Sequence, residues 1–498
     1  MNIDDVTQEN ATLKTQLDEK NQRILALEEF IQHLQRKKFS PSSEKIPANQ
    51  LNLFNEAEDQ SLVEEANTEV VEETAVKGHT RTKKPRVSIP DHLPRENIEY
   101  DLTEQEKTCP HDQTPLVRIG TEDHEQLDII PAQIKVIHHR RHKYTCPCCK
   151  QYQVTASKPK QPIEKGIASP GLLAHVATQK YCDALPLYRQ TAIFKRIGIT
   201  LDRGNLANWM IRCGELTQPL INLMTEQIRE KPVVHMDETT LQVLKEPDKT
   251  PQSKSYLWLM ANFDERPMVV FHYDPRRHAE VPNLLLDQTV NALMIDGYDG
   301  YQPACGSYNI IRLGCWAHAR RKFVDAQKLQ PKGKVGKADQ ALAYIQRLYR
   351  IEKAIKHLSV EEKYKTRQAE AKPIIDKLHQ WLEKHLASSP PSMTIGKALY
   401  YLHNQWPRLI RYLDNGTYPI DNNLAENAVR PFTIGRKNWL FANSQAGANA
   451  SANLYSLIET AKANNLNPYD YLKAVFTRLP NCQSVDEIEM LLPWQVNL

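Results

Sequence analysis

The chain has 498 residues, of which 41% are hydrophobic and 25% charged, a composition typical of a soluble protein with several structural units. It has no apolar run of membrane length and no N-terminal signal pattern, so we expect a cytoplasmic protein without a membrane partner. The net charge of +4 does not by itself indicate nucleic acid, because basic residues matter only where they cluster. The nine cysteines favour a metal site in a reducing compartment over a disulfide framework.

Residues 1–38 have the heptad pattern of a coiled coil. Apolar residues recur at spacings of three and four, and Asn10, Leu17, Ile24 and Ile31 occupy the a positions. An asparagine at one a position, together with oppositely charged g and e positions, favours a parallel homodimer. The alternative is an amphipathic helix that packs on its own chain.

Residues 39–100 are predicted to form a linker that is largely disordered. An acidic stretch at 56–73 precedes a basic one at 78–86, and neither has enough apolar residues to bury a core. The basic stretch is either a solvated run of charge or a segment that lies along phosphates.

Residues 101–160 are predicted to form a small zinc-binding module. Cys109 and His111 precede a strand-like stretch at 126–136, and Cys146 and Cys149 follow it. Thiolate and imidazole are the ligands that structural zinc prefers, and they meet here at the two ends of a hairpin. Either His111 or Asp112 completes the set of four ligands. The end of the module is basic, and its candidate phosphate contacts are Arg140, Arg141 and Lys143.

Residues 161–228 are predicted to be helical and to bind DNA. A tight turn at 197–200, where Gly198 allows positive φ, separates two of the expected helices. Such spacing is typical of a helix-turn-helix, in which Arg203 and Asn205 would face a groove, although helical pairs are also common as plain packing. The helices are expected over 172–179, 187–196 and 201–213.

Two apolar strands each carry an acid. One strand, at 231–244, contains Asp237, and a later one leads into Asp296. Two strands and a helix at 276–287 are expected between them, and a fifth strand at 309–313 follows. This order is typical of a ribonuclease-H-like α/β fold, whose first and fourth strands are neighbours, so both acids would face one site. A strand-end acid that caps a turn is the alternative for Asp237.

A third acid is expected on a helix within 418–431, YPIDNNLAENAVRP. Asp421 and Asn422 are N-cap residues there, and Glu426 lies in the first turns. Three convergent carboxylates can hold two divalent metal ions that promote phosphoryl displacement on nucleic acid.

Further basic residues flank these acids. After the fifth strand, Cys315 and His318 are one helical turn apart, but two ligands without partners do not make a metal site. The residues that we expect to contact DNA are Arg320, Arg321, Arg430, Arg436 and Lys437.

Five motifs together resemble the DDE transposases of the insertion-sequence-sixty-six type: HMDET, IDGYDGY, GCWAHARRKF, IDNNLAENAVRP and GRKNWLF. The resemblance implies DNA transposition, with Asp237, Asp296 and Glu426 as an acidic triad for two magnesium or manganese ions. In related enzymes a C-x-x-H pattern lies near the active centre, which implies that His318 is an accessory residue, as Arg430 would be. A structural histidine is the alternative. The family usually has a cysteine near position 112, which leaves the fourth zinc ligand open.

The resemblance implies hydrolysis at the element ends, followed by attack of the freed 3′ hydroxyl on target DNA. Expected partners are double-stranded DNA, further copies of the chain and accessory proteins of the same element, at the nucleoid. The alternatives are a catalytically silent DNA-binding scaffold or repressor, and a resolvase or structure-specific nuclease. The remaining expected units of this multidomain α/β chain are a catalytic domain at 229–325 and 416–454, a helical insertion at 326–415 and a C-terminal helical region at 455–498.

Overall fold

The computed structural model describes residues 134–145, 153–330 and 335–498, besides isolated earlier positions. The chain divides into two compact units, Val70–Lys158 and a larger one made of Met1–Glu69 and Pro159–Leu498. The linker, the four predicted zinc ligands and the predicted coiled coil, except for Lys14, Lys20 and Ile24, lie outside the described residues. No helix in the described ranges is long and apolar enough to span a membrane.

In the unit Val70–Lys158, the described residues form an antiparallel hairpin. Strand β1 (Lys143–Thr145) pairs with β2 (Gln153–Thr155), and Arg141 Nε donates a hydrogen bond to the Ala156 carbonyl over 2.6 Å. The sequence predicts a strand that extends to residue 136. The described part of that prediction is wrong, since residues 134–142 have no regular structure. Their main chain has no partner strand among the described residues of this unit.

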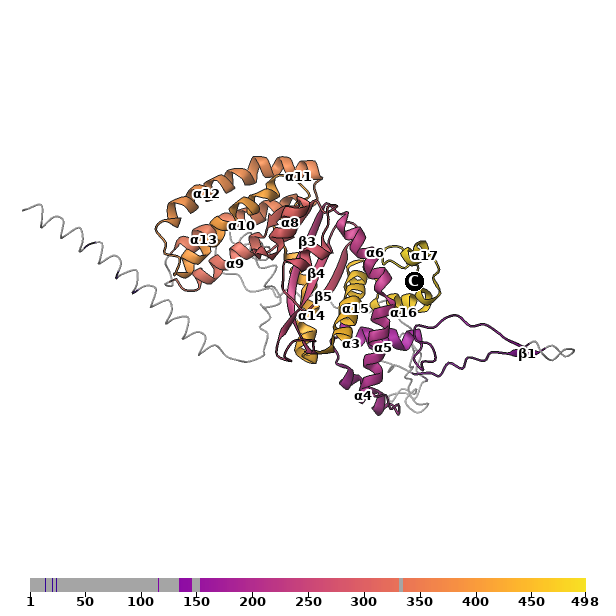
Figure 1. Ribbon diagram of the computed structural model, residues 1–498. Coiled ribbons are helices and arrows are strands. Elements are labelled where there is room, and N and C mark those ends of the chain that lie inside the picture. Colours follow the sequence, from indigo (N-terminus) through magenta and orange to yellow (C-terminus); the bar gives the residue numbers. More distant parts are fainter. Residues whose placement is uncertain are drawn as a thin grey trace, which may run out of the picture. The chain divides into compact units, whose positions relative to one another are not determined.

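The larger unit is built around a six-stranded mixed sheet (Figure 1). Its strand order is β5-β4-β3-β6-β7, and β8 pairs with the far end of β3. The first three strands along the chain are antiparallel, whereas β6, β7 and β8 run parallel to their neighbours. The strands are β3 (Val233–Lys245), β4 (Lys254–Asn262), β5 (Met268–Asp274), β6 (Ala292–Ile295), β7 (Ile311–Gly314) and β8 (Ala442–Ser444).

Alternate residues of β6 are buried in two separate hydrophobic cores. Leu293 and Ile295 belong to the core on one face of the sheet, and Ala292 and Met294 belong to the core on the other. Successive side chains of a strand point to opposite faces, so a strand covered on both sides is apolar at every position. This explains the unbroken apolar run that precedes Asp296.

The first core joins the sheet to helices from both ends of the larger unit. Helix α15 (Gln445–Ala463) runs along β5 and packs against α5 (Arg203–Leu216), where a Cβ on Gly214 would lie 2.5 Å from Ala450 Cα. Asp202 caps α5 by accepting a hydrogen bond from the Gly204 amide over 2.7 Å. The other helices here are α3 (Pro170–Tyr181), α4 (Leu187–Arg196), α6 (Gln218–Arg229), α16 (Pro468–Arg478) and α17 (Val485–Glu489).

Side chains of α15 bond directly to the edge strand β5. The amides of Val269 and Phe271 donate to Thr460 Oγ1 and Ser456 Oγ over 3.0 and 2.7 Å. Thr460 Oγ1 in turn donates to the Val269 carbonyl over 2.9 Å. The helix thereby satisfies main-chain groups that an edge strand otherwise leaves unpaired.

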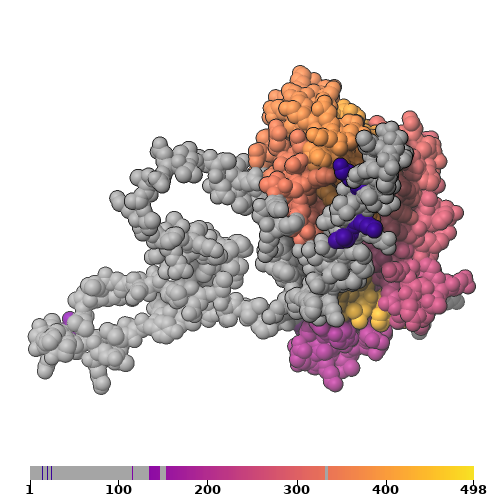
Figure 2. All heavy atoms as spheres, turned by 90° about the vertical axis from the view of Figure 1, so that its left-hand side faces the viewer, coloured from indigo at the N-terminus to yellow at the C-terminus, as the bar shows by residue number. Residues whose placement is uncertain are grey.

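The second core joins the other face of the sheet to the helices of residues 316–413. Arg367, which is buried, pairs with Glu352 over 2.7 Å and donates to the carbonyls of Tyr412 and Asn415. In the space-filling view these helices, in orange, form one continuous patch at the top (Figure 2). They are α9 (Trp316–Gln327), α10 (Lys337–Ile355), α11 (Val360–Thr366), α12 (Lys372–Leu386) and α13 (Thr394–Leu409).

Two helices near the predicted acids differ in length from the expectation. Helix α7 covers only Glu280–Leu285, because Arg276 forms a turn on Asp274 Oδ1 before it, over 2.7 Å. Helix α14 (Asn423–Trp439) continues for eight residues past Pro431, where the motif ends. Proline costs a helix one hydrogen bond, and the packing of α14 on β3 offsets that loss.

Candidate active site

The predicted acids lie where one side of β3 has no neighbouring strand. Strand β6 pairs with β3 as far as His235, and β8 pairs with it again only from Val243. Helix α14 packs against β3, and Asp237 and Glu238 lie in the interval between the two pairings. The Glu238 amide donates to Asp237 Oδ1 over 2.8 Å.

The other two predicted acids reach this place from β6 and α14. Asp296 directly follows β6, and its Oδ1 accepts a hydrogen bond from the Tyr298 amide over 2.8 Å. Glu426 lies in the first turn of α14 and is 7% exposed. Burial raises the pKa of Asp237 well above its usual range, and the charges of Glu238, Glu426 and Asp296 raise it further. Three acids far apart in sequence are therefore carried by elements that meet at this part of β3.

Asn422 connects these elements through both its side chain and its main chain. Its Nδ2 donates to the carbonyl of Met236 over 2.9 Å, and its Oδ1 accepts from His235 Nδ1 over 2.8 Å. Its amide donates to Cys315 Sγ over 3.2 Å. The sequence predicted a side-chain cap here, but the Asn422 side chain makes no cap bond, because it is used to bind β3.

Two side chains from α9 meet the carboxylate of Glu426. Arg321 Nη2 lies 3.0 Å from Oε2, and His318 Nδ1 lies 3.4 Å from Oε1. Neither Oε1 nor Nδ1 has a hydrogen-bond partner among the described residues, although both atoms are buried. Burial lowers the pKa of His318, and the charge of Glu426 partly opposes this shift. A buried carboxylate oxygen without a donor, beside other crowded acids, fits a divalent cation.

A second polar network surrounds Glu238, which the sequence analysis did not single out. Its Oε2 accepts from the Tyr301 hydroxyl over 2.6 Å, and its Oε1 accepts from Arg277 Nε over 2.8 Å. The Arg277 guanidinium stacks 3.8 Å from the centre of the Tyr298 ring. The two tyrosines of IDGYDGY are the sequence signal that could have predicted this network, because aromatic residues beside an acidic turn can bind both a cation and an acid.

The predicted DNA contacts divide into exposed and buried side chains. Arg320 is only 7% exposed and lies on the buried face of α9, so it is not available to a phosphate. Arg436 is half-buried and donates to the Thr240 carbonyl and Thr240 Oγ1, which binds α14 to β3. Arg430 is half-buried. The exposed members are Arg140, Arg141, Lys143, Arg203, Asn205 and Lys437, and Arg321 is partly exposed.

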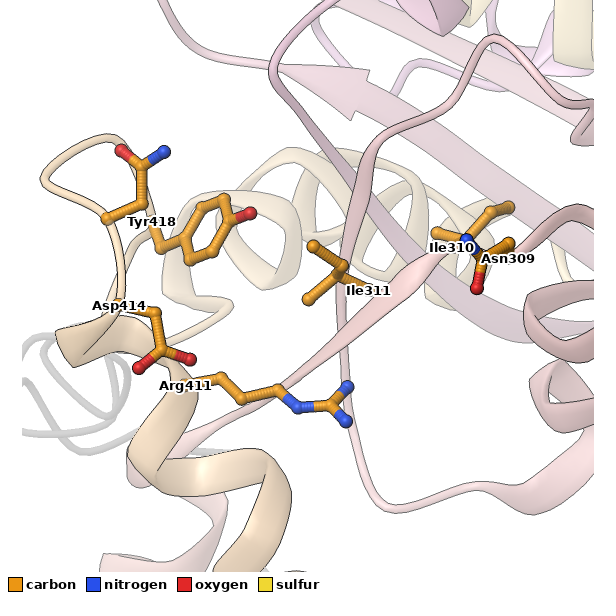
Figure 3. A pocket seen from close by; sticks show the side chains of 7 residues that line it. Asn309, Ile310, Ile311, Arg411, Asp414 and Tyr418 are labelled. Carbon is orange, nitrogen blue, oxygen red and sulfur yellow. The ribbon is translucent and has the colours of Figure 1, made fainter.

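A pocket of about 380 Å³ lies away from the acids (Figure 3). Its wall includes Ile311, the first residue of β7, whereas Asp296 follows the last residue of the parallel strand β6. The lining residues are Asn309, Ile310, Ile311, Arg411, Asp414, Asn415 and Tyr418. Because opposite ends of parallel strands are involved, the acids and this pocket form separate sites.

Family comparisons match most of the chain. The Transposase IS66 family matches residues 165–450, and the IS66 C-terminal element matches residues 456–494. The zinc-finger binding domain of transposase IS66 matches residues 106–150, which contain all the predicted zinc ligands. A fourth family, described as Transposase C of IS166 homeodomain, matches residues 26–98. Together they indicate a DNA-binding chain with a zinc finger and a use for divalent metal.

Proteins of Sinorhizobium fredii (strain NBRC 101917 / NGR234) are similar over most of the chain. The uncharacterized protein y4qI is 33% identical over 507 residues, covering 98% of this chain and 92% of that protein. The uncharacterized protein y4jD is 33% identical over 422 residues, covering 82% of this chain and 81% of that protein.

Proposed function

Because the chain belongs to the IS66 transposase family, we propose that it cleaves the ends of its insertion sequence and joins the freed 3′ hydroxyl to target DNA. Asp237, Asp296 and Glu426 form its acidic triad. One observation carries this proposal: β3, which contains Asp237, pairs in parallel with β6, which ends just before Asp296, and packs against α14, which contains Glu426.

The catalytic domain has a ribonuclease-H-like fold in this proposal. The sheet order β5-β4-β3-β6-β7 supports it, because the first and fourth strands are neighbours. The parallel pairing of Val233–His235 with Ala292–Met294 also supports it, since it brings the ends that carry the two aspartates to one edge.

Asp237, Asp296 and Glu426 would hold two magnesium or manganese ions, which prefer oxygen ligands. Such ions, when bound, activate the attacking hydroxyl and stabilise the leaving oxygen. The chain's own residues position these ligands: Asn422 holds α14 on β3, and Arg321 orients the Glu426 carboxylate. Zinc would bind separately at Cys109, His111, Cys146 and Cys149, with Asp112 as the alternative to His111.

Double-stranded DNA would contact the exposed basic residues on several elements. Arg203 and Asn205 begin α5, and Arg321 and Lys437 lie on the two helices that approach the acids. Arg140, Arg141 and Lys143 belong to the hairpin unit. Arg320 and Arg436 leave this set because their side chains are used inside the protein. The coiled coil at 1–38 would pair copies of the chain, and accessory proteins of the element would join them.

The test is magnesium-dependent cleavage of DNA that carries the element's own ends. Purified full-length protein is compared with Glu426→Gln and with Asp325→Asn, a surface acid on α9 that pairs only with Lys328 among the interactions described, over 3.1 Å. We expect cleavage by the unmodified protein and by Asp325→Asn, and none by Glu426→Gln.

Strand transfer by Asp296→Asn at the unmodified rate would reject the triad. If the protein binds the ends tightly but cleaves nothing, the accessory proteins of the element are added. Cleavage that appears on their addition supports the transposase. Continued binding without cleavage favours the catalytically silent scaffold or repressor.

A further inference from the structure

We propose that Cys315, His318 and Glu426 form a binding site for a thiophilic divalent metal ion such as zinc. This site differs from the three-carboxylate site in its ligands, which are one sulfur, one nitrogen and one oxygen atom. It shares Glu426 with the three-carboxylate site, so its effect on cleavage rests on the proposed function, whereas its metal binding does not.

The backbone places the three ligands together. Cys315 is the N-cap residue of α9 and His318 lies three residues later, so both are on one side of the first turn. Helix α14 brings Glu426 to them, and the ligand atoms of all three residues lie within 4.8 Å of one another. Cys315 and His318 alone are two ligands without partners, and α14 supplies the third.

The spacing of the ligand atoms is close to that of a tetrahedral site. His318 Nδ1 and Glu426 Oε1 are 3.4 Å apart. Around a tetrahedral zinc ion with bonds of about 2.0–2.3 Å, neighbouring ligand atoms are roughly 3.3–3.7 Å apart. Cys315 Sγ lies within 4.8 Å of both atoms, so a movement of the thiol toward them completes three ligands. A water molecule can occupy the fourth position, as in open zinc sites.

Two buried atoms in this cluster have no hydrogen-bond partner in the described structure. They are His318 Nδ1 and Glu426 Oε1, which face each other, and the Glu426 residue is 7% exposed. Leaving a buried polar atom unpaired is costly, so most such atoms have a hydrogen-bond partner or bind an ion. Both are the atoms that would bind the metal, and this second observation distinguishes the cluster from an accidental group of side chains.

The surroundings suit a soft divalent ion rather than magnesium. Cys315 is 2% exposed, and its Sγ accepts the amide hydrogen of Asn422. Burial and the charges of Asp421 and Glu426 raise the pKa of its thiol, and a divalent ion that binds the sulfur displaces the thiol proton. A thiolate and a carboxylate together neutralise two positive charges, and Arg321 stays on the other carboxylate oxygen of Glu426. Magnesium and calcium avoid sulfur, whereas zinc and cobalt accept it.

The experiment measures cobalt binding to the full-length protein. The protein is purified with its zinc module filled and is then titrated with Co²⁺, because a cobalt–thiolate bond absorbs strongly in the near ultraviolet and a cobalt–carboxylate bond does not. We expect one further equivalent of Co²⁺ with a thiolate band and the visible spectrum of a tetrahedral site.

Matched cysteine variants identify the ligand. Cys315→Ser removes the thiolate band, whereas Cys305→Ser, a change at another buried cysteine in α8 (Gln302–Tyr308), keeps it. His318→Gln, at a partly exposed side chain, weakens Co²⁺ binding at least about tenfold. Circular dichroism and thermal unfolding test whether each variant is folded. If Cys315→Ser does not fold, His318→Gln takes its place as the test of the site.

Absence of a thiolate band in the unmodified protein overturns the proposal, as does an equal band in folded Cys315→Ser. Neither result depends on DNA cleavage, so failure of this site is distinguishable from failure of the transposase assignment.

A second measurement adds zinc to the magnesium-dependent cleavage reaction. Zinc is expected to inhibit cleavage by binding Glu426. For each protein the cleavage rate is compared with its own rate without zinc. Half-maximal inhibition of Cys315→Ser should need about tenfold more zinc than that of the unmodified protein.

Discussion

The side chain of Asn422 donates a hydrogen bond to the main-chain carbonyl of Met236, over 2.9 Å. Met236 directly precedes Asp237, and Asn422 directly precedes α14, which carries Glu426. One buried amide therefore fixes the distance between two of the three predicted catalytic acids. A catalytic site of this kind needs such support, because small displacements of metal ligands are costly to activity.

Asn422→Ala is expected to weaken both stability and metal use. The change leaves the Met236 carbonyl and His235 Nδ1 without buried partners, which should cost about 2–4 kcal/mol of unfolding free energy. Cleavage should need more magnesium to reach half its maximum rate. Urea unfolding and a magnesium titration measure the two effects. The control is Asn438→Ala, whose side chain donates at the surface to the Ala184 carbonyl. Equal stability of both variants would contradict the role given to Asn422.

Asp237→Asn is expected to stabilise the protein when no magnesium is added. The change removes a buried charge that faces the like charges of Glu238, Glu426 and Asp296, for a gain on the order of 1–2 kcal/mol. Added magnesium should raise the melting temperature of the unmodified protein but not that of the variant, because a ligand stabilises only the state that binds it. Thermal unfolding with and without magnesium tests this. A variant that magnesium stabilises as much as it does the parent would exclude Asp237 as a ligand.

Arg277→Ala is expected to destabilise the protein at the active-site edge, whereas Arg276→Ala should have little effect on stability. Arg277 pairs with Glu238, whose side chain is 4% exposed, so its removal leaves a buried carboxylate without its cation and should cost about 2–3 kcal/mol. Arg276 is 56% exposed and pairs with the exposed Glu280 over 3.0 Å and with the mostly buried Asp274 over 3.4 Å. Arg276→Ala keeps the main-chain bond to Asp274, so it should change stability by less than about 0.5 kcal/mol. Chemical denaturation of both proteins provides the comparison. Equal losses would show that the pair with Glu238 has no special role.

Stability should rise with pH above 8 because of Lys180. Its ammonium lies about 5 Å from the ring centres of Tyr181 and Trp439, and burial lowers its pKa to about 8. Between that pKa and the unfolded value near 10.4 the unfolded chain binds more protons than the folded one, so folding gains about 1–3 kcal/mol across this window. Lys180→Met should remove that dependence and stabilise the protein most at neutral pH. Unfolding of both proteins at pH 7, 8.5 and 9.5 tests the sign, and parallel curves would refute it.

The sequence predicts the strands around the acids well, because each is a short apolar run with a polar end. The strand expected at 231–244 lies at Val233–Lys245, and the parallel register with β6 follows from the expected order of elements. Helix boundaries were less accurate. A turn on Asp274 shortens α7, and tertiary packing carries α14 through Pro431.

The contacts of single side chains could not be predicted in the same way. Arg320 and Arg321 are adjacent in a basic run, but α9 buries the first and exposes part of the second, which depends on the helix phase against the second core. Asn422 has the composition of a cap, and its bond to Met236 depends on a strand far away in sequence. Glu426 meets His318 only because α9 and α14 approach the same edge of the sheet.

The hydroxyl groups that α15 places on β5 restrict how copies of this protein can assemble. Val269 and Phe271 have their outward amides occupied by Thr460 and Ser456, and Asn464 Nδ2 donates to the Pro267 carbonyl over 2.8 Å just before the strand. A foreign strand that approached β5 would find the amides of Val269 and Phe271 already bonded. A second copy of the chain that met this border would therefore contact helix α15 and side chains instead of the main chain of Val269 and Phe271.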